Sequence, residues 1–429
     1  MKKNEKRALR WVRLDNAAKI YPAARRRNWS NVYRQSVTLF EDVDKEVLKS
    51  ALKVTAKRFP SIAARLRRGL FWFYLQQVDT PPEIRREQSY PLVFMNNKEM
   101  RKCALRVIAY HNRIAVEFFH SLTDGAGALV FLKTLTAEYL EQKYGISIPC
   151  EDGILDRKQA PRPEELEDSF LKHTCPVAAS RKSANAWRPV LDPMPGGFLN
   201  LTCFTLPVRD VLEKAREKSV SLTVFLSAVM MQALQNWQKE AVTQKEKRKR
   251  NKLLIPINLR QLFPSQTLRN FAMYTIPEID PRLGEYSFDE ICKIIQCKMG
   301  EEFTAKHMST VITKNVQDER NPLVRLIPLP LKNLVMKLIF DSVGERKSCL
   351  SLSNLGAIKL PEIMQSYVQR MDFILGVQAA APYNCGVLSY GDTLYINFIR
   401  NTRDPNLERH FFAVLRDMGL TVTVESNQN

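Results

Sequence analysis

The chain has 429 residues, of which 45% are hydrophobic and 26% are charged, and this composition excludes a largely disordered protein. Its length is enough for two ordinary domains, each with a sizeable core. The 65 lysine and arginine residues outnumber the 45 acidic residues, so the formal net charge is +20. The basic start Met1–Arg7 precedes no apolar signal core, and we expect a cytoplasmic protein.

The first half of the chain has the pattern of a mixed α/β unit. Its apolar runs and helical periodicities predict strands at 32–40, 71–75 and 105–110 and a helix over 45–58. The run Arg113–Phe119 predicts a largely buried strand, and Ala126–Leu140 has apolar residues at helical spacing. The short segment between these last two elements is therefore held between core elements.

That segment reads His120-Ser-Leu-Thr-Asp124-Gly125. A histidine at a strand end can take a proton from an alcohol or an amine, because its ordinary pKa lies near neutral pH. Asp124 falls where the helix begins and can accept backbone N–H groups, and Gly125 and Gly127 allow a close turn. The alternative is a core histidine followed by a helix cap. Only five histidines occur in the chain, which makes a chance match to this pattern rare.

The second half repeats the order of strands and helices after an irregular crossover rich in proline. The pattern predicts strands at 201–206, 253, 393–398 and 420–424 and helices at 208–218, 222–239 and 406–418. We therefore predict an N-terminal domain over 1–150, a crossover over 151–200 and a C-terminal domain over 201–429. The fold class is α/β with mixed sheets.

The most apolar late stretch, Leu323–Phe340, is too interrupted to span a membrane. The interrupting residues are Arg325, Pro328, Pro330, Lys332 and Lys337. We expect a helix that lines the core, and no transmembrane segment. The alternative is a helix that lies on a membrane surface, so peripheral membrane contact stays open.

Three further segments accompany the histidine motif in order. They are Trp11–Pro22, then Leu254-Ile-Pro-Ile-Asn258-Leu-Arg260 with Leu268-Arg-Asn270-Phe271, and finally Leu350-Ser-Leu-Ser353-Asn354-Leu-Gly356. With His-x-x-x-Asp-Gly, these segments resemble the chloramphenicol acetyltransferase-like acyltransferase superfamily, in its branch of bacterial alcohol O-acetyltransferases and condensation domains. The Asp-Phe-Gly-Trp-Gly motif of the plant branch is absent, which argues against that branch.

The resemblance implies two similarly folded domains that form a pseudo-dimer, with a channel between them and His120 midway along it. His120 is then the general base. Asp124, with Gly125, has a structural role and pairs with Arg260 of the other domain. Ser353 or Asn354 is the candidate for stabilising an oxyanion, unless the two residues only end a strand.

The resemblance also implies that acyl-CoA is a co-substrate and that the acceptor is a small alcohol or amine. The acyl group, which we expect to be acetyl, passes directly, without an acyl-enzyme and without a tightly bound cofactor. The sequence has no phosphate-binding loop, no nucleophile elbow and no zinc helix, and its eight cysteines lack metal-ligand spacing. We expect no metal and a monomer.

The basic run over 245–252 contributes to the positive charge. We assign Lys247, Arg248, Lys249 and Arg250 as candidate contacts for the phosphates of coenzyme A, and the alternative is a solvated loop. No nucleic-acid partner is expected, because aromatic residues do not alternate with the basic ones.

Two other function classes stay open. One is a condensation-type enzyme that takes its acyl group from a carrier-protein thioester, and the other is a non-catalytic binding protein of the same fold. The absence of an attached carrier-like segment weighs against the first. The intact His120, Asp124 and Gly125 weigh against the second.

Overall fold

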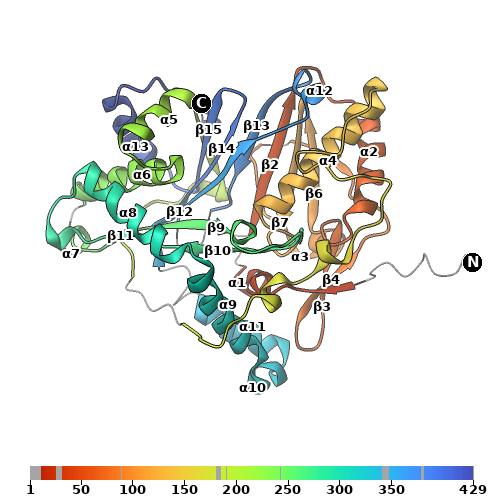
Figure 1. The fold of residues 1–429 in the computed structure, drawn as a ribbon, viewed down its shortest axis with the longest axis horizontal. Helices are drawn as coiled ribbons and strands as arrows, with labels where there is room; N and C mark the ends of the chain where they lie inside the picture. The colour runs from red at the N-terminus through yellow and green to blue at the C-terminus, as the bar shows by residue number, and fades with distance from the viewer. Residues whose placement is uncertain are drawn as a thin grey trace, which may run out of the picture.

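The computed structural model describes residues 11–25, 31–87, 89–179, 185–189, 191–241, 243–340, 347–377 and 381–428 (Figure 1). The described chain forms three sheets, and helices flank the two larger ones. Parallel and antiparallel strand pairs occur in both larger sheets. The expected mixed α/β fold class is therefore confirmed.

A five-stranded sheet has the order β13-β2-β7-β6-β5. Its strands are β2 (Val32–Leu39), β5 (Ile84–Arg86), β6 (Leu105–Tyr110), β7 (Arg113–Phe119) and β13 (Val368–Ile374). Helix α2 (Lys45–Arg58) packs against α4 (Gly125–Tyr144), which in turn packs on β2. Asp44 caps α2 by accepting the amides of Glu46 and Val47. The helix predicted over 45–58 and the strands predicted at 105–110 and 113–119 are confirmed.

An eight-stranded sheet has the order β10-β9-β12-β14-β15-β8-β16, and β11 pairs with β9 beside this path. Its strands are β8 (Asn200–Pro207), β9 (Asn251–Asn258), β10 (Ala272–Thr275), β11 (Glu278–Ile279), β12 (Leu350–Ile358), β14 (Tyr383–Tyr390), β15 (Thr393–Arg400) and β16 (Thr423–Ser426). The helices around it are α5 (Val208–Glu217), α6 (Leu222–Lys239), α8 (Phe288–Glu302) and α13 (Asn406–Asp417). Short helices are α3 (Asn97–Met100), α7 (Gln244–Lys247) and α12 (Glu362–Gln365).

The two larger sheets meet along β13 and β14. Strand β13 comes late in the chain, yet it pairs with β2 and completes the five-stranded sheet. On its other side it packs on β14, where a Cβ atom added to Gly386 would lie 2.3 Å from the carbonyl oxygen of Phe373. Only glycine permits this approach of the two backbones. The division into domains at residues 151–200 stays a prediction.

The third sheet lies at one end of the molecule. It comprises β1 (Trp11–Arg13), β4 (Phe73–Gln77) and β3 (Ala64–Arg68), and near it lie α1 (Ile20–Ala24), α9 (Ala305–Arg320), α10 (Pro322–Leu326) and α11 (Leu329–Ile339). The strand expected at 71–75 begins two residues later, because residues 69–72 form the turn between β3 and β4.

The expectation that the apolar stretch over 323–340 lines the core is wrong. Helices α10 and α11 expose these side chains: Leu323, Leu326, Leu331, Leu334, Val335 and Leu338. In α11, Leu329 and Lys332 are the buried residues among those whose side chains are described. Within the described part of the chain, no helix has the length and apolar character needed to cross a membrane.

Candidate active site

His120 lies directly after β7, where the chain turns toward α4. Its backbone amide donates to the carbonyl of Asn31 at 2.9 Å, which fixes this strand end beside β2. The imidazole stacks on the ring of Tyr21, with centroids 4.3 Å apart, and meets the ring of Tyr33 edge-on at 4.9 Å. The Tyr33 hydroxyl donates to the carbonyl of Thr123 at 2.9 Å. Two aromatic rings thus fix the plane of the imidazole.

A chain of polar contacts holds one nitrogen of the imidazole. His120 Nδ1 lies 3.1 Å from Asn270 Oδ1, and Asn270 Nδ2 donates to Asp15 Oδ2 at 3.3 Å. Asp15 is fully buried, accepts the amide of Ala18 at 2.7 Å and lies 3.5 Å from Arg269 Nη2. Because the carboxylate of Asp15 takes the NH2 group of Asn270, the amide oxygen faces His120. Nδ1 therefore carries the proton, and Nε2 keeps its lone pair.

The protonation state of His120 suits a base. Burial lowers the pKa of His120 below its ordinary value, and the nearby backbone, Asp124 and Asn270 oppose this change without reversing it. Burial disfavours the charged imidazolium. The ring is therefore neutral near pH 7, which leaves Nε2 able to accept a proton.

Asp124 caps α4 and contacts the second half of the chain. Its Oδ1 accepts the amide of Gly127 at 3.0 Å, and its Oδ2 accepts the amide of Phe271 and Arg260 Nη1, both at 2.8 Å. A Cβ atom at Gly127 would lie 2.3 Å from the carbonyl oxygen of Leu268, so the first turn of α4 has no room for a side chain there. The ion pair that the family resemblance implies for Asp124 is present. Asp124 thus joins two distant segments, and its carboxylate is occupied.

Arg260 forms hydrogen bonds with the backbone of the loop that carries Asn270. Besides Asp124, its guanidinium donates to the carbonyls of Thr267 at 3.0 Å and Arg269 at 2.6 Å. These contacts fix the backbone on both sides of 268, immediately before Asn270. The pair therefore stabilises α4 and, through the loop, the residue that contacts His120 Nδ1.

Strand β12 lies beside the group formed by His120, Asp124, Arg260 and Asn270, which we call the His120 corner. A Cβ atom at Gly125 would lie 2.9 Å from Leu355 Cδ2, so the segment with Ser353 and Asn354 lies next to the start of α4. The pairing of β12 with β14 shifts register between Asn354 and Ala357. Asn354 donates to Thr223 Oγ1 at 3.1 Å and accepts the amide of Gly356 at 2.8 Å. The Ser353 hydroxyl forms no hydrogen bond with any residue in the described ranges, so its donor is available.

The basic run lies elsewhere. Helix α7 is at the left edge of Figure 1, whereas β7 and α4 are in the right half of the same view. Arg250 pairs with Glu278 and, at 3.2 Å, with Asp280. The structure thus does not bring Lys247, Arg248, Lys249 and Arg250 to the His120 corner, and their contact with coenzyme A stays a prediction.

Sequence reasoning missed three residues at this site. Asn270, Asp15 and Tyr21 all contact His120 or its hydrogen-bonded partner. Each lies in a segment that carried the family resemblance, but neither periodicity nor residue type distinguished it from its neighbours. No local signal in the sequence could have found them, because their contacts join segments that lie far apart in the chain.

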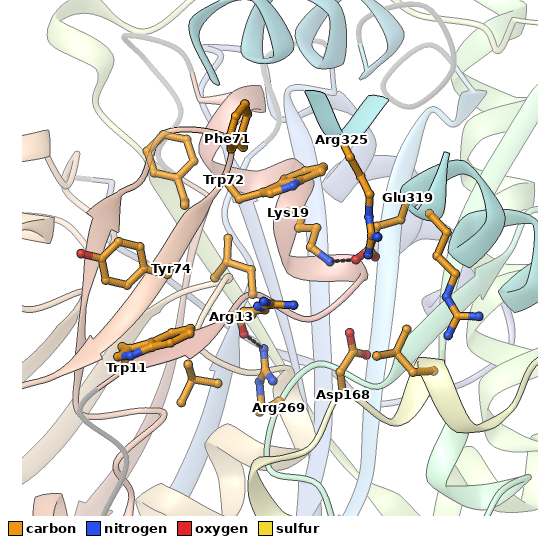
Figure 2. A pocket seen from close by; sticks show the side chains of 15 residues that line it. Trp11, Arg13, Lys19, Phe71, Trp72, Tyr74, Asp168, Arg269, Glu319 and Arg325 are labelled. Carbon is orange, nitrogen blue, oxygen red and sulfur yellow. Dashed lines mark hydrogen bonds and ion pairs between the residues drawn. The ribbon is translucent and has the colours of Figure 1, made fainter. Parts of the chain in front are cut away.

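A cavity of about 1510 Å³ opens beside this corner (Figure 2). Phe71, Trp72 and Arg325 lie on one side of it, and Arg269 and Asp168 lie on the opposite side. Arg269 connects the cavity to His120 through Asp15 and Asn270. Burial, with the neighbouring Asp15, raises the pKa of Asp168 to about 6. The cavity thus presents aromatic rings together with groups of both charges.

One family model, described as Alcohol acetyltransferase, matches residues 198–376. The matched segment includes Arg260, Asn270, Ser353 and Asn354, and His120 precedes it. No curated protein matches this chain by sequence.

Solved structures share the fold over nearly the whole chain. TRI101 of Fusarium graminearum, complexed with coenzyme A and T-2 mycotoxin, is 11% identical, with a TM-score of 0.61 and coverage of 98% of this chain and 100% of its own. TRI3 trichothecene 15-O-acetyltransferase of Fusarium sporotrichioides is 10% identical, with a TM-score of 0.60 and coverage of 95% and 94%. The first condensation domain of the CDA synthetase is 12% identical, with a TM-score of 0.58 and coverage of 95% of both chains.

Proposed function

We propose that this chain, an acyltransferase of the chloramphenicol acetyltransferase-like superfamily, moves an acetyl group from acetyl-CoA to a hydroxyl acceptor with His120 as general base. The observation that carries the proposal is the contact between His120 Nδ1 and Asn270 Oδ1, which leaves Nε2 unprotonated. The match to the alcohol acetyltransferase family model supports the choice of acceptor and acyl group.

The reaction needs one proton transfer in each direction. Nε2 of His120 takes the hydroxyl proton while the acceptor oxygen attacks the thioester carbonyl, and a tetrahedral oxyanion forms. The oxyanion collapses, the carbon–sulfur bond breaks, and the imidazolium returns the proton to the thiolate. The products are an ester and free coenzyme A, and no residue of the protein is acylated.

The charge on the tetrahedral oxygen requires a donor. We assign this role to the Ser353 hydroxyl, because it forms no hydrogen bond in the described ranges, whereas Thr223 and Gly356 already hold the Asn354 amide in one orientation. One such donor commonly contributes about 3 kcal/mol to transition-state stabilisation. Ser353→Ala should therefore lower kcat with little change in KM.

The substrates have to reach His120 from solution. We propose that they do so through a channel between the two halves of the chain, as in the pseudo-dimer that the resemblance implies. The cavity of Figure 2 reaches Arg269, and His120 is not among the residues that line it. The enzyme is expected to act as a monomer in the cytoplasm, with acyl-CoA as a co-substrate and with no resident cofactor.

The direct test is thiol release from acetyl-CoA in the presence of small alcohols or amines, with the purified full chain. The proposal predicts acceptor-dependent release of coenzyme A with alcohols and formation of the matching ester. Release without an acceptor, together with a stable acyl adduct on the protein, would contradict direct transfer. Turnover with amines alone would show that the acceptor is an amine and not an alcohol. The role of His120 as general base would be unchanged.

The condensation-type reaction is the second candidate, because a condensation domain shares the fold over 95% of both chains. In that reaction, the same base would act on a thioester carried by a phosphopantetheine arm. A comparison of acetyl-CoA, acetyl-pantetheine and an acetylated carrier protein separates the two. Turnover with the carrier-bound thioester alone would favour the condensation-type reaction. Unaltered thioesters in every combination would favour a binding protein.

A further inference from the structure

One end of the molecule exposes an unusual amount of apolar surface. We call it the apolar end, and it consists of the exposed apolar side chains of α10 and α11 named above together with Leu70 and Phe71 of the β3–β4 turn. Leu323 is 77% exposed, Leu326 70% and Leu70 74%. Exposed apolar residues that occur singly are ordinary, but a cluster of this kind marks a contact surface.

The helices and the turn form one continuous surface. The amide of Leu329 donates to the carbonyl of Leu70 at 3.0 Å, and Lys332 Nζ donates to the carbonyl of Phe71 at 3.1 Å. The same ammonium group lies 3.7 Å from the centroid of the Trp72 ring. In α11, whose place in the fold Figure 1 shows, Leu329 and Lys332 are thus buried, whereas Leu331, Leu334 and Leu338 are exposed. This arrangement is the reverse of a helix that packs its apolar face on a core.

The two segments that carry the apolar end have charge of one sign, and the carboxylates that precede Arg320 in α9, Asp318 and Glu319, pair with Lys314 and Lys19. No aspartate or glutamate occurs in 322–340 or in 64–77, and each segment has three lysine or arginine residues. Arg68, Arg320, Arg325 and Lys337 are exposed, and none of them forms an ion pair with a carboxylate in the described ranges. Exposed leucines with unpaired cations beside them match the interfacial region of an anionic bilayer, where apolar side chains enter the acyl boundary and cations meet phosphate groups.

We propose that the apolar end docks on an anionic lipid surface. Phe71 of the apolar end and the neighbouring Arg325 of α10 both line the cavity in Figure 2, so docking places the cavity mouth at the lipid surface. The net charge of +20 adds a long-range attraction to the same surface. The docking does not depend on the acyl-transfer reaction and is tested without it.

The test measures binding of the full chain to vesicles by co-sedimentation. Vesicles of phosphatidylcholine mixed with phosphatidylglycerol are compared with vesicles of phosphatidylcholine alone, at low and at high salt. We expect binding to the mixed vesicles, weaker binding at high salt and little binding to the neutral vesicles. Equal binding to both kinds of vesicle, or none to the mixed vesicles, would overturn the proposal.

The apolar contribution is tested by Leu326→Ser, Leu334→Ser and Leu338→Ser combined. The partition coefficient for mixed vesicles should fall about tenfold or more, because each exposed leucine contributes to insertion. The matched control combines Val177→Ser, Leu283→Ser and Val424→Ser, which are exposed to a similar extent but lie outside the apolar end. The control should bind as the wild type does. Equal loss in both triple variants would contradict the assignment of the surface.

The cationic contribution is tested by Arg320→Gln, Arg325→Gln and Lys337→Gln combined, with Arg209→Gln and Arg416→Gln as the control. Only the first set should weaken binding to mixed vesicles, and the loss should shrink at high salt. Circular dichroism confirms the fold of each variant.

Sedimentation velocity tests whether a second copy of the chain, in place of a lipid surface, covers the apolar end. A dimer that the leucine substitutions dissociate, combined with no vesicle binding, would contradict the proposal.

Discussion

The His120 corner and the apolar end differ in which side chains they bury: the corner buries polar groups, and the apolar end exposes apolar ones. At the corner, Asp124 and Arg260 lie largely buried, and hydrogen bonds from several segments satisfy them. At the apolar end, leucines lie exposed, and the neighbouring Arg325 has no carboxylate partner in the described ranges. A satisfied polar network holds one geometry, whereas exposed apolar groups gain stability when something covers them.

The difference shows which region finds all its interaction partners within the chain. The corner is complete within the chain, because Asp124, Arg260 and Asn270 bring together segments more than 130 residues apart. The apolar end becomes complete only on contact with a partner. Substitutions at the corner should therefore change catalysis and stability, and those at the apolar end should change binding.

The largest effect is expected for His120→Ala. Loss of the general base should lower kcat/KM for acyl transfer at least about a hundredfold, because the attacking hydroxyl then keeps its proton. Steady-state rates on folded protein measure this effect. His410→Ala, which removes a histidine paired with Glu240 on the surface, should leave the rate unchanged. Near-normal turnover of His120→Ala would remove this residue from the mechanism.

Arg260→Ala should have the next largest effect. It leaves the carboxylate of Asp124 buried without its cation, at a cost of about 3 kcal/mol in the free energy of unfolding, and it should also lower activity. Asp124→Asn should act in the same direction. Denaturant unfolding gives the value, and Arg282→Ala, which removes an exposed guanidinium and leaves Asp280 paired with Arg250, should stay within about 0.5 kcal/mol of the wild type. Equal destabilisation by Arg260→Ala and Arg282→Ala would show that the buried pair adds nothing.

Asn270→Ala should have a smaller but more diagnostic effect. We expect kcat to fall about ten- to a hundredfold, since the imidazole loses its orientation. The hydrogen bond from His120 to Asn270 raises the pKa of His120, so its removal lowers that pKa further. The acid limb of the pH profile, where the base becomes protonated, therefore moves to lower pH. Asn236→Ala serves as the control, and a loss of rate with an unmoved limb would indicate a purely structural role.

The smallest effect is expected from the basic run. Substitution of Lys247, Arg248, Lys249 and Arg250 by glutamine should raise KM for acyl-CoA about three- to tenfold at low salt, and less at high salt. A pantetheine thioester, which lacks the nucleotide phosphates, should be unaffected. An unchanged KM for both donors would assign the run to a solvated loop, in keeping with the ion pairs of Arg250.

The sequence predicted helices and strands better than it predicted the contacts between distant segments. The helix over 45–58 and the strands before His120 follow from local periodicity, and the structure has them. Asn270 escaped detection because its contact with His120 spans 150 positions in the chain, and no local pattern records such a pairing. The placement of β13 beside β2 escaped for the same reason.

The error at α10 and α11 has a different cause. Apolar content alone led to the expectation of a core helix, but a core helix would not place Lys332 inward and Leu334 outward. The position of the lysine within the apolar run was visible in the sequence. The contacts of Lys332 with the carbonyl of Phe71 and the ring of Trp72 were not visible there. These contacts hold the lysine side of α11 against the β3–β4 turn and leave the leucines exposed.

The central claim is that Asn270 and Asp15 hold neutral His120 with its proton on Nδ1 and its lone pair on Nε2. Nitrogen NMR on protein labelled with ¹⁵N-histidine reads this tautomer directly. With five histidines in the chain, His120→Ala identifies the signal by its loss. The account predicts a protonated Nδ1 in the wild type near pH 7 and a loss of that preference in Asn270→Ala. A neutral His120 with its proton on Nε2 would contradict the account, because that nitrogen could not then accept the proton of the acceptor.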